Sequence, residues 1–167
     1  MIKEVVGDIL NPKKKGPDVL CHVCNLEHTM GAGIAKHIKE KYPEAYEADQ
    51  KTVISDKNRL GSYSVANVMH KAGTRNVLGP GFIINIYAMP NFGEFSYDAF
   101  YKAMSYLSHK LGEIKEKTGF YLTVGVPYGI GCNLAGGNWP ITRAILEEIW
   151  GKSPIELTIY KLPLTIK

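Results

Sequence analysis

The chain has 167 residues and a formal net charge of +4, and its 45% hydrophobic and 22% charged residues are ordinary for a globular protein. This composition excludes a disordered or fibrous chain, and the length fits one domain, taken as residues 1–167, that buries a core without disulfide or metal staples. No apolar run approaches the roughly 18 residues that span a bilayer. Glu4 and Asp8 interrupt the apolar start of the chain, so no secretion signal and no membrane contact are expected.

Short β-branched runs alternate with helical periods along the chain. Strands are predicted, in chain order, over Ile2–Val6, Val19–Cys24, Ser62–Val68, Phe82–Ala88, Phe120–Val126 and Glu156–Lys161. Helices are predicted over Gly33–Lys41, Glu44–Ile54, from an N-cap at Ser96 to Lys117, and over Ile141–Trp150. The long helix has an apolar stripe expected in the core, formed by Phe100, Ala103, Met104, Leu107, Leu111 and Ile114. Strands separated by helices predict a three-layer α/β/α sandwich with a mostly parallel mixed sheet.

Cysteine count and charge set expectations about compartment and partners. Three cysteines cannot all pair, and nothing marks the chain as secreted, so reduced thiols in a cytoplasmic protein are expected. The densest basic run, Lys13–Lys15, is expected in a solvated loop. A nucleic-acid footprint usually has a higher isoelectric point than 8.8, so a small anionic ligand is the favoured partner and nucleic acid is not. We expect a monomer.

Glycine and polar residues follow three of the predicted strands, at the sheet edge where ligands bind in such folds. The three segments are Gly7-Asp8-Ile9, Asn25 followed by Met30–Ala35, and Pro127–Gly137. A glycine-rich turn from strand to helix leaves backbone N–H groups free at a positive helix end, which makes an anion site. Two such loops that face each other would hold both phosphates of a diphosphate.

Together these segments resemble a macro domain. The resemblance rests on GDIL near the start, HVCNLEHTMGAGIA with KHIKEKYPEAYEAD following, and VPYGIGCNLAGGNW, and it extends from Ile2 to about Leu162. More narrowly, the chain resembles the bacterial and phage branch related to ADP-ribose 1''-phosphate phosphatases and terminal ADP-ribose glycohydrolases. The resemblance implies binding of ADP-ribose or a derivative, with no metal and no cofactor.

The resemblance also implies roles for individual residues. Asp8 would accept a hydrogen bond from the adenine amino group beside the Ile9 backbone; the alternative is that it only caps a helix or turn. Asn25 would hold the distal ribose, and Tyr160 would lie near the adenine unless it is a plain sheet residue. The diphosphate loops would supply Met30, Gly31, Ala32, Gly33 and Ile34 from one side, and Pro127, Gly129, Ile130, Gly131, Cys132, Asn133 and Leu134 from the other.

Catalysis is a separate question from binding. Glycohydrolase relatives use a lysine after the fourth predicted strand and an aspartate in the second loop, but that strand is followed by no lysine and the loop has Ala135. A Schiff-base mechanism is therefore not expected. Hydrolysis of a 1''-phosphate by water attack needs only an aligned water, donors for the developing charge and an acid or base. Asn25 and His28 are the candidate catalytic residues. The alternatives are a non-catalytic ADP-ribose reader and a de-ADP-ribosylating hydrolase that acts by a substrate-assisted route.

The remaining histidines are given structural interpretations. His22, inside a buried strand, is expected to be a core histidine, and His37 and His109 are expected on helix surfaces. His70 falls in a loop, and the segment 71–81 is expected to form a loop or hairpin turn that borders the site.

Cysteine chemistry is not expected to drive a reaction. Cys21 and Cys24 form half of a zinc-ligand pattern, but the other half is missing and residues three apart in a strand face opposite ways, so both are expected in the core. Cys132 lies in a glycine loop at a predicted helix start, where the pKa of a thiol can be lowered.

Overall fold

The computed structural model describes residues 1–69 and 78–165. Within them, six strands form one sheet: β1 (Ile2–Val6), β2 (Val19–Asn25), β3 (Tyr63–Asn67), β4 (Phe82–Met89), β5 (Val124–Pro127) and β6 (Leu157–Lys161). The first four predicted strands and the last one are confirmed to within one or two residues at each end. The expectations for His70 and for the first part of segment 71–81 lie outside the described residues.

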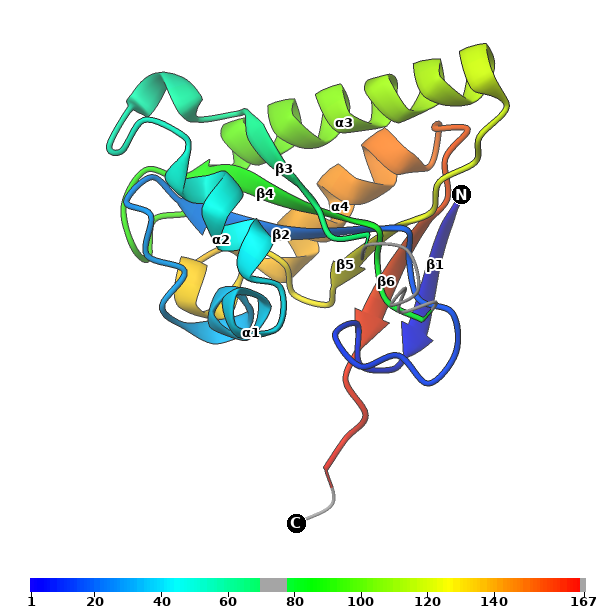
Figure 1. Cartoon of the computed structure of the whole chain (residues 1–167), viewed down its shortest axis with the longest axis horizontal. Coiled ribbons are helices and arrows are strands. Elements are labelled where there is room, and N and C mark those ends of the chain that lie inside the picture. Colours follow the sequence, from blue (N-terminus) through cyan, green and yellow to red (C-terminus); the bar gives the residue numbers. More distant parts are fainter. Residues whose placement is uncertain (70–77, 166–167) are drawn as a thin grey trace.

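The sheet has the strand order β1-β6-β5-β2-β4-β3. All neighbours are parallel except β3, which pairs antiparallel with β4 at one edge. Helices α1 (Gly33–Lys41) and α2 (Pro43–Gln50) cover one face, and α3 (Tyr97–Thr118) and α4 (Trp139–Trp150) cover the other (Figure 1). The three-layer α/β/α sandwich with a mostly parallel mixed sheet is thus confirmed.

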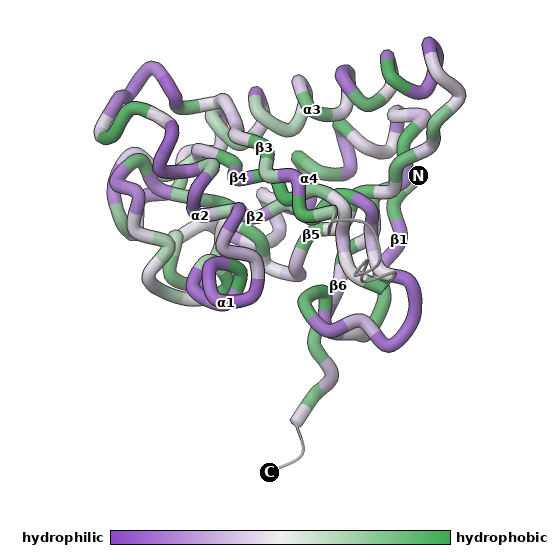
Figure 2. Tube along the Cα trace, viewed as in Figure 1, coloured by the Kyte–Doolittle hydropathy of each residue, from purple (hydrophilic) through white to green (hydrophobic). Residues whose placement is uncertain are grey.

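The pleat of the central strands divides the core into two clusters, one on each face of the sheet. In β4, Ile84 and Ile86 pack under α3 and α4, whereas Ile83 and Tyr87 pack under α1 and α2. The hydrophilic residues of α1 lie on the outer side of that helix (Figure 2). Buried polar side chains occur on both faces, for example Thr142 of α4 on one and Asn85 of β4, which faces α2, on the other. The buried charged side chains, Asp49 and Arg59, lie on the face under α1 and α2.

Helix ends follow from local hydrogen bonds. Ser96 Oγ accepts from the Ala99 N–H at 3.1 Å, which confirms the predicted N-cap of α3, and Gly119 ends the helix with φ +73°. The second predicted helix ends at Gln50 instead of Ile54. The Thr52 hydroxyl donates to the Asp49 carbonyl at 2.5 Å and closes the last turn of α2.

Two expectations about the far end of the sheet were wrong. The strand predicted over Phe120–Val126 begins only at Val124, because β6 starts opposite it at Leu157 and earlier residues have no strand to pair with. Phe120 is accordingly 72% exposed. Ile114, expected in the core with the rest of its stripe, is 41% exposed, because the end of α3 runs past the sheet (Figure 1).

Among the described residues, no helix combines the length and the apolar character needed to cross a bilayer. Even α3, with 22 residues, has charged side chains along its length.

Candidate functional site

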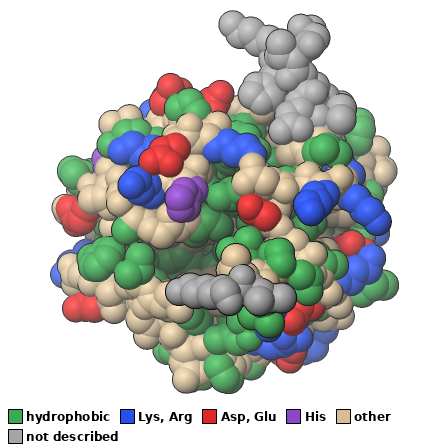
Figure 3. Space-filling model, turned by 90° about the horizontal axis from the view of Figure 1, so that it is seen from below, with side chains coloured by type: hydrophobic (Ala, Val, Ile, Leu, Met, Phe, Trp, Pro, Cys, Tyr) green, Lys and Arg blue, Asp and Glu red, His purple; other side chains and the backbone are tan. Residues whose placement is uncertain are grey.

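A cavity of about 1040 Å³ opens where the parallel strands end. Residues that follow β1, β2, β5 and β6 meet the N-terminus of α1 around it, and Figure 3 shows the hollow in the face of the molecule seen there. Its volume lies at the upper end of the roughly 300–1,000 Å³ usual for small-molecule sites. The sheet edge is the position expected for a ligand in an open α/β fold.

Every predicted ligand-binding residue lines this cavity. They are Asp8, Ile9, Asn25, Met30, Gly31, Ala32, Gly33, Ile34, Pro127, Gly129, Ile130, Gly131, Cys132, Asn133, Leu134 and Tyr160. The fold thus brings together segments separated by more than a hundred positions in the sequence. What each residue binds stays a prediction.

The first glycine-rich loop presents the positive end of α1 to the cavity. Gly33 begins the helix with φ +56°, and the N-cap residue, Ala32, has no side chain that could cap it. Within the described residues, no hydrogen-bond partner is recorded for the N–H groups of Gly33, Ile34 and Ala35. These are the donors that a helix start leaves for an anion.

The second loop exposes backbone N–H groups at alternate positions. Gly129 and Gly131 have φ +74°, and their amides are without a recorded partner in the described chain, whereas the amide of Cys132 donates to the Gly129 carbonyl at 2.8 Å. Gly131 must be glycine because a Cβ there would lie 2.4 Å from the Phe95 ring. A Cβ on Gly129 would meet nothing within 4 Å. The loop is therefore open on its ligand side and tightly supported beneath.

The two loops lie close together. A Cβ placed on Gly33 would lie 3.4 Å from Cδ1 of Leu134, and residues of both loops line the same cavity. Two sets of free amides converging on one space are suited to an anion with several oxygens, such as a diphosphate.

Asp8 both caps a turn and faces the cavity. Its Oδ1 accepts from the Leu10 N–H at 2.9 Å, and its Oδ2 accepts from Asn11 Nδ2 at 3.0 Å. Partial burial acts to raise the pKa of Asp8, but the bonds from Asn11 and Leu10, with the charge of Lys41, lower it below its usual value. The turn-cap interpretation is confirmed, and the ionised carboxylate is still available to a ligand donor at the cavity wall.

Asn25 ends β2 at an irregularity in the pairing with β4. Its Oδ1 accepts from the Glu27 N–H at 2.9 Å, and its Nδ2 donates to Thr29 Oγ1 at 2.8 Å. Both ends of the amide are thus held by the loop that leads to Met30, in an orientation fixed before any ligand arrives.

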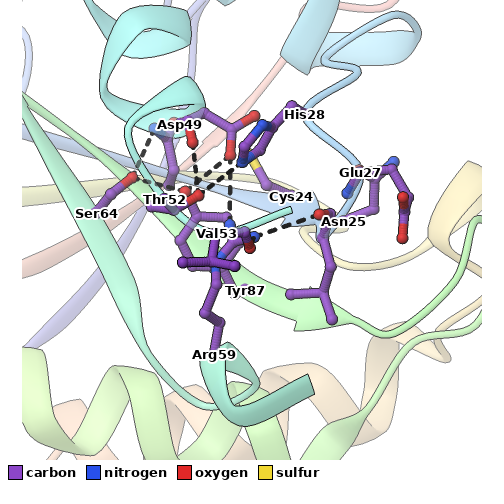
Figure 4. Close-up of polar contacts among 12 residues, drawn as sticks. Cys24, Asn25, Glu27, His28, Asp49, Thr52, Val53, Arg59, Ser64 and Tyr87 are labelled. Atoms are coloured by element: carbon purple, nitrogen blue, oxygen red, sulfur yellow. Dashed lines mark hydrogen bonds and ion pairs between the residues drawn. The ribbon is translucent and has the colours of Figure 1, made fainter. Parts of the chain in front are cut away.

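His28 points away from the cavity and does not line it. Its Nε2 bonds to Thr52 Oγ1 at 2.8 Å, just beyond the end of α2 (Figure 4). The backbone at His28 has φ +54°, which turns the side chain toward α2 and away from the amides of α1. Its predicted role as a proton carrier therefore has no geometric support, and His28 instead ties the loop to α2.

The other titratable side chains behave as buried or structural groups. Cys21 and Cys24 are buried, as expected, and burial raises the pKa of both thiols. Burial also raises the pKa of Cys132, which corrects the expectation of a lowered value. His22 is fully buried, and its Nε2 bonds to Asn85 Oδ1 at 2.6 Å, which confirms a core histidine.

A metal ion has no obvious ligand set here. No cluster of three or more histidine, cysteine or acidic side chains with metal-binding geometry lies within residues 1–69 and 78–165.

Some cavity residues escaped the sequence analysis. Phe92, 65% exposed, lies in the turn between β4 and α3. Tyr128, near the start of the second loop, packs on Trp139 with the ring centres 4.7 Å apart and the planes tilted by 49°. Lys41 donates to the Leu10 carbonyl and to Asn11 Oδ1 at 2.8 Å. His37, correctly expected on the helix surface, also borders the opening. Tyr128 was within a motif already singled out, whereas Phe92, His37 and Lys41 carried no signal of their own.

Comparison with known proteins was made at the levels of family, sequence and structure. No protein-family model matches the chain. A 17.5 kDa uncharacterised protein of Enterobacteria phage T4, from the tk-vs intergenic region, is 32% identical over 163 residues, which cover 93% of this chain and 94% of the phage protein.

Solved structures resemble this chain along nearly its whole length. The macrodomain of Mycobacterium tuberculosis DarG superposes with a TM-score of 0.69 at 21% identity, covering 99% of both chains. Thermosipho africanus DarTG, solved in complex with ADP-ribose, superposes with a TM-score of 0.65 at 19% identity over 90% of this chain and 39% of its own. The chain therefore has the macrodomain fold and belongs to the same family as the phage T4 protein.

Proposed function

We propose that the cavity binds ADP-ribose. The observation that supports this most strongly is that two sets of free backbone amides, at the start of α1 and in the second loop, lie in the lining of one cavity. A diphosphate carries oxygens on both phosphates, so amides arriving from two sides can hold it without a lysine or arginine.

The orientation of the ligand follows from the two ends of the cavity. Asp8 is an ionised acceptor at one end, suited to the amino group of adenine, with Tyr160 nearby on β6. Asn25 would then face the distal ribose. The complex of the Thermosipho africanus protein with ADP-ribose supports the proposal, because that protein has the same fold.

We further propose that ADP-ribose 1''-phosphate is a substrate, hydrolysed at the phosphate by water. In this orientation a 1''-phosphate would lie beside Asn25 and the amides of the second loop, which could stabilise the charge that develops on its oxygens. His28 is left out of this mechanism because it is bonded to Thr52 outside the cavity.

Binding without turnover is the second candidate, favoured by the titratable groups near Asn25. His22 is neutral in the core, since burial lowers its pKa to about 4, and burial raises the pKa of Cys24 and Cys132. None of them is suited to take a proton from water near neutral pH. Such a protein would read or sequester ADP-ribose.

A lysine nucleophile is poorly supported. Among the described residues, the lysines that line the cavity are Lys41, bonded to Leu10, and Lys161, whose Nζ lies 4.7 Å from the centre of the Tyr128 ring. Neither follows β4. De-ADP-ribosylation would therefore need the substrate-assisted route, in which loop amides orient a water.

The test is a titration with ADP-ribose followed by assays for phosphate release from ADP-ribose 1''-phosphate and for loss of ADP-ribose from modified protein or nucleic acid. Binding with phosphate release supports the phosphatase, and binding without any release supports the reader. Asn25→Ala is expected to lower turnover more than affinity, and normal turnover in that variant would remove Asn25 from the mechanism. Loss of label from a modified macromolecule would identify the third activity.

A further inference from the structure

The loop between β2 and α1 is held in part by the Asn25 side chain, which bonds the Glu27 N–H and Thr29 Oγ1, but two of its residues have backbone angles that need further support. The backbone φ angles of His28 and Met30 are +54° and +38°, in the left-handed region that residues with a Cβ disfavour. Such residues persist only where the surroundings fix them. This loop, residues 25–30, holds Asn25 at one end and leads into the first diphosphate loop at the other.

A buried arginine contacts this loop from beneath. Arg59, in the short 3-10 helix Lys57–Arg59, is 9% exposed. Its Nη1 donates to the carbonyl of Leu26 at 3.3 Å and to that of Val53 at 2.5 Å, so one guanidinium joins the loop to the segment after α2 (Figure 4). The guanidinium also lies 4.1 Å from the centre of the Tyr87 ring.

Asp49 of α2 is the charge partner of Arg59 and is 1% exposed. Its Oδ1 lies 3.6 Å from Arg59 Nη2 and accepts from the Tyr87 hydroxyl at 2.8 Å. Asp49 Oδ2 and Arg59 Nε and Nη2 are buried with no hydrogen-bond partner in the described chain. A buried pair with unsatisfied atoms is costly, and apolar side chains in its place are often at least as stable. We therefore take the pair to position the groups that it contacts, and not to stabilise the fold.

Thr52 links Asp49 to His28. The Thr52 hydroxyl donates to the Asp49 carbonyl at 2.5 Å, so its oxygen accepts from His28 Nε2 at 2.8 Å. This bond fixes the His28 tautomer, with the proton on Nε2. A bond between the Ser55 N–H and the Leu26 carbonyl, at 2.9 Å, adds a third tie to the loop.

We propose that Asp49, Thr52 and Arg59 form a positioning cluster that fixes the backbone of loop 25–30, and through it Asn25 and the amides of the first diphosphate loop. None of the three side chains lines the cavity, so they act through the loop and not on the ligand. The effect on ligand binding rests on the proposed ADP-ribose function, whereas the effect on the loop does not.

The cluster offers a matched control on its far side. Ser64 Oγ lies 2.8 Å from the Tyr87 hydroxyl and accepts from Asn85 Nδ2 at 3.0 Å, but it has no bond to the loop. Ser64→Ala therefore disturbs the same buried polar region and leaves the ties to Leu26 and His28 intact. Any effect common to Ser64→Ala and Arg59→Met is general destabilisation.

The first readout needs no ligand. Backbone amide NMR spectra of the wild type, Arg59→Met, Thr52→Val and Ser64→Ala would report the conformation of residues 25–35 directly. We expect shifted or broadened amides there in the first two variants and not in Ser64→Ala, with Arg59→Lys intermediate. Thr52→Val keeps the ion pair and serves if Arg59→Met does not fold. Unchanged amides over residues 25–35 in Thr52→Val and Arg59→Lys would overturn the proposal.

The second readout compares ADP-ribose with adenosine, which keeps the adenine end and lacks both phosphates and the distal ribose. Arg59→Met is expected to weaken ADP-ribose binding by about tenfold and to change adenosine binding by less than about twofold, since the Asp8 end is not tied to the cluster. Equal losses for both ligands would overturn the positioning role. A wild type that binds neither ligand would refute the proposed function, and the amide spectra would still decide the inference.

Discussion

The two glycine-rich loops of the cavity expose the same chemical group, the backbone N–H, but they are held in opposite ways. The first follows loop 25–30, which is contacted by polar and charged side chains, since Arg59 bonds the Leu26 carbonyl and Thr52 bonds His28. The second is held by close packing and a backbone bond, since the Phe95 ring lies against Gly131 and the Gly131 carbonyl accepts from the Gly137 N–H at 2.9 Å. The first arrangement depends on the charges of Asp49 and Arg59 and on the tautomer of His28. The second depends on a residue without a Cβ at Gly131.

This difference predicts different weaknesses. A side-chain network responds to pH and to isosteric substitution, whereas a loop packed through glycine tolerates pH but not one added carbon. Of the four predictions that follow, from the largest expected effect to the smallest, the first two test this difference and the last two test the parts of the cavity beside it.

Gly131→Ala should be the most damaging change. The new Cβ would lie 2.4 Å from Phe95 at a residue with φ +74°, so we expect a loss of about 3 kcal/mol or more in the free energy of unfolding. Gly129→Ala has the same φ and no neighbour within 4 Å, and should lose only about 1 kcal/mol for the backbone conformation. Urea unfolding of both variants measures the difference. Equal losses would show that Phe95 does not support the second loop.

Acid should destabilise the buried polar network beneath α2 through His22, which bonds Asn85 and is linked through Ser64 and Tyr87 to Asp49. Burial lowers the pKa of His22 to about 4, below the roughly 6.5 of an unfolded chain, so its contribution is complete above pH 6.5 and is lost as the pH falls toward 4. The loss amounts to about 3 kcal/mol over that window.

His22→Gln supplies the reference for this pH dependence, because its amide can still donate to Asn85 and does not titrate. Burial raises the pKa of Asp49, which acts in the opposite direction and is common to both proteins. Unfolding free energies measured between pH 4 and pH 7 should therefore diverge toward acid. Parallel curves would contradict a neutral buried His22.

Asp8→Ala tests the end of the cavity that neither loop forms. We expect ADP-ribose affinity to fall by about 1–3 kcal/mol, because a charge-assisted acceptor is lost. Asp8→Asn keeps the acceptor for the Leu10 N–H and removes the charge, so it separates the turn from the ligand contact. Calorimetric affinities equal to that of the wild type would refute the adenine assignment.

Phe92→Ala should have the smallest effect. Phe92 is 65% exposed beside the second loop, so stability should change by less than about 1 kcal/mol, while a ligand that covers the ring would bind up to about fivefold more weakly. Phe120→Ala, 72% exposed and outside the cavity lining, is the control and should change neither. Identical affinities in both variants would place Phe92 outside the binding site.

The sequence predicted the strands, the helices and the cavity segments well, because periodicity and glycine-rich turns are local signals. The prediction failed where contacts between segments distant in the sequence decide the local conformation. Phe120 and Tyr121 have strand-forming side chains but no neighbouring strand, so they lie exposed before β5. His28 follows Asn25 closely in sequence, but a positive φ turns it toward Thr52.

The positioning cluster shows the same limit more sharply. Asp49 and Arg59 lie in segments that appear polar and solvent-facing in the sequence, and only the packing of α2 on the sheet buries them against Tyr87. A charged residue that ends up in the core gives no local signal, because the same residue types cover most helix surfaces.

The central claim is that the cavity binds ADP-ribose through amides held from two sides. Calorimetric titration of the wild type with ADP-ribose tests it most directly, with Gly131→Ala and Arg59→Met titrated in parallel. The account predicts micromolar binding by the wild type and weaker binding by both variants, one for each loop. No binding by the wild type at millimolar ligand, in a folded preparation, would contradict it.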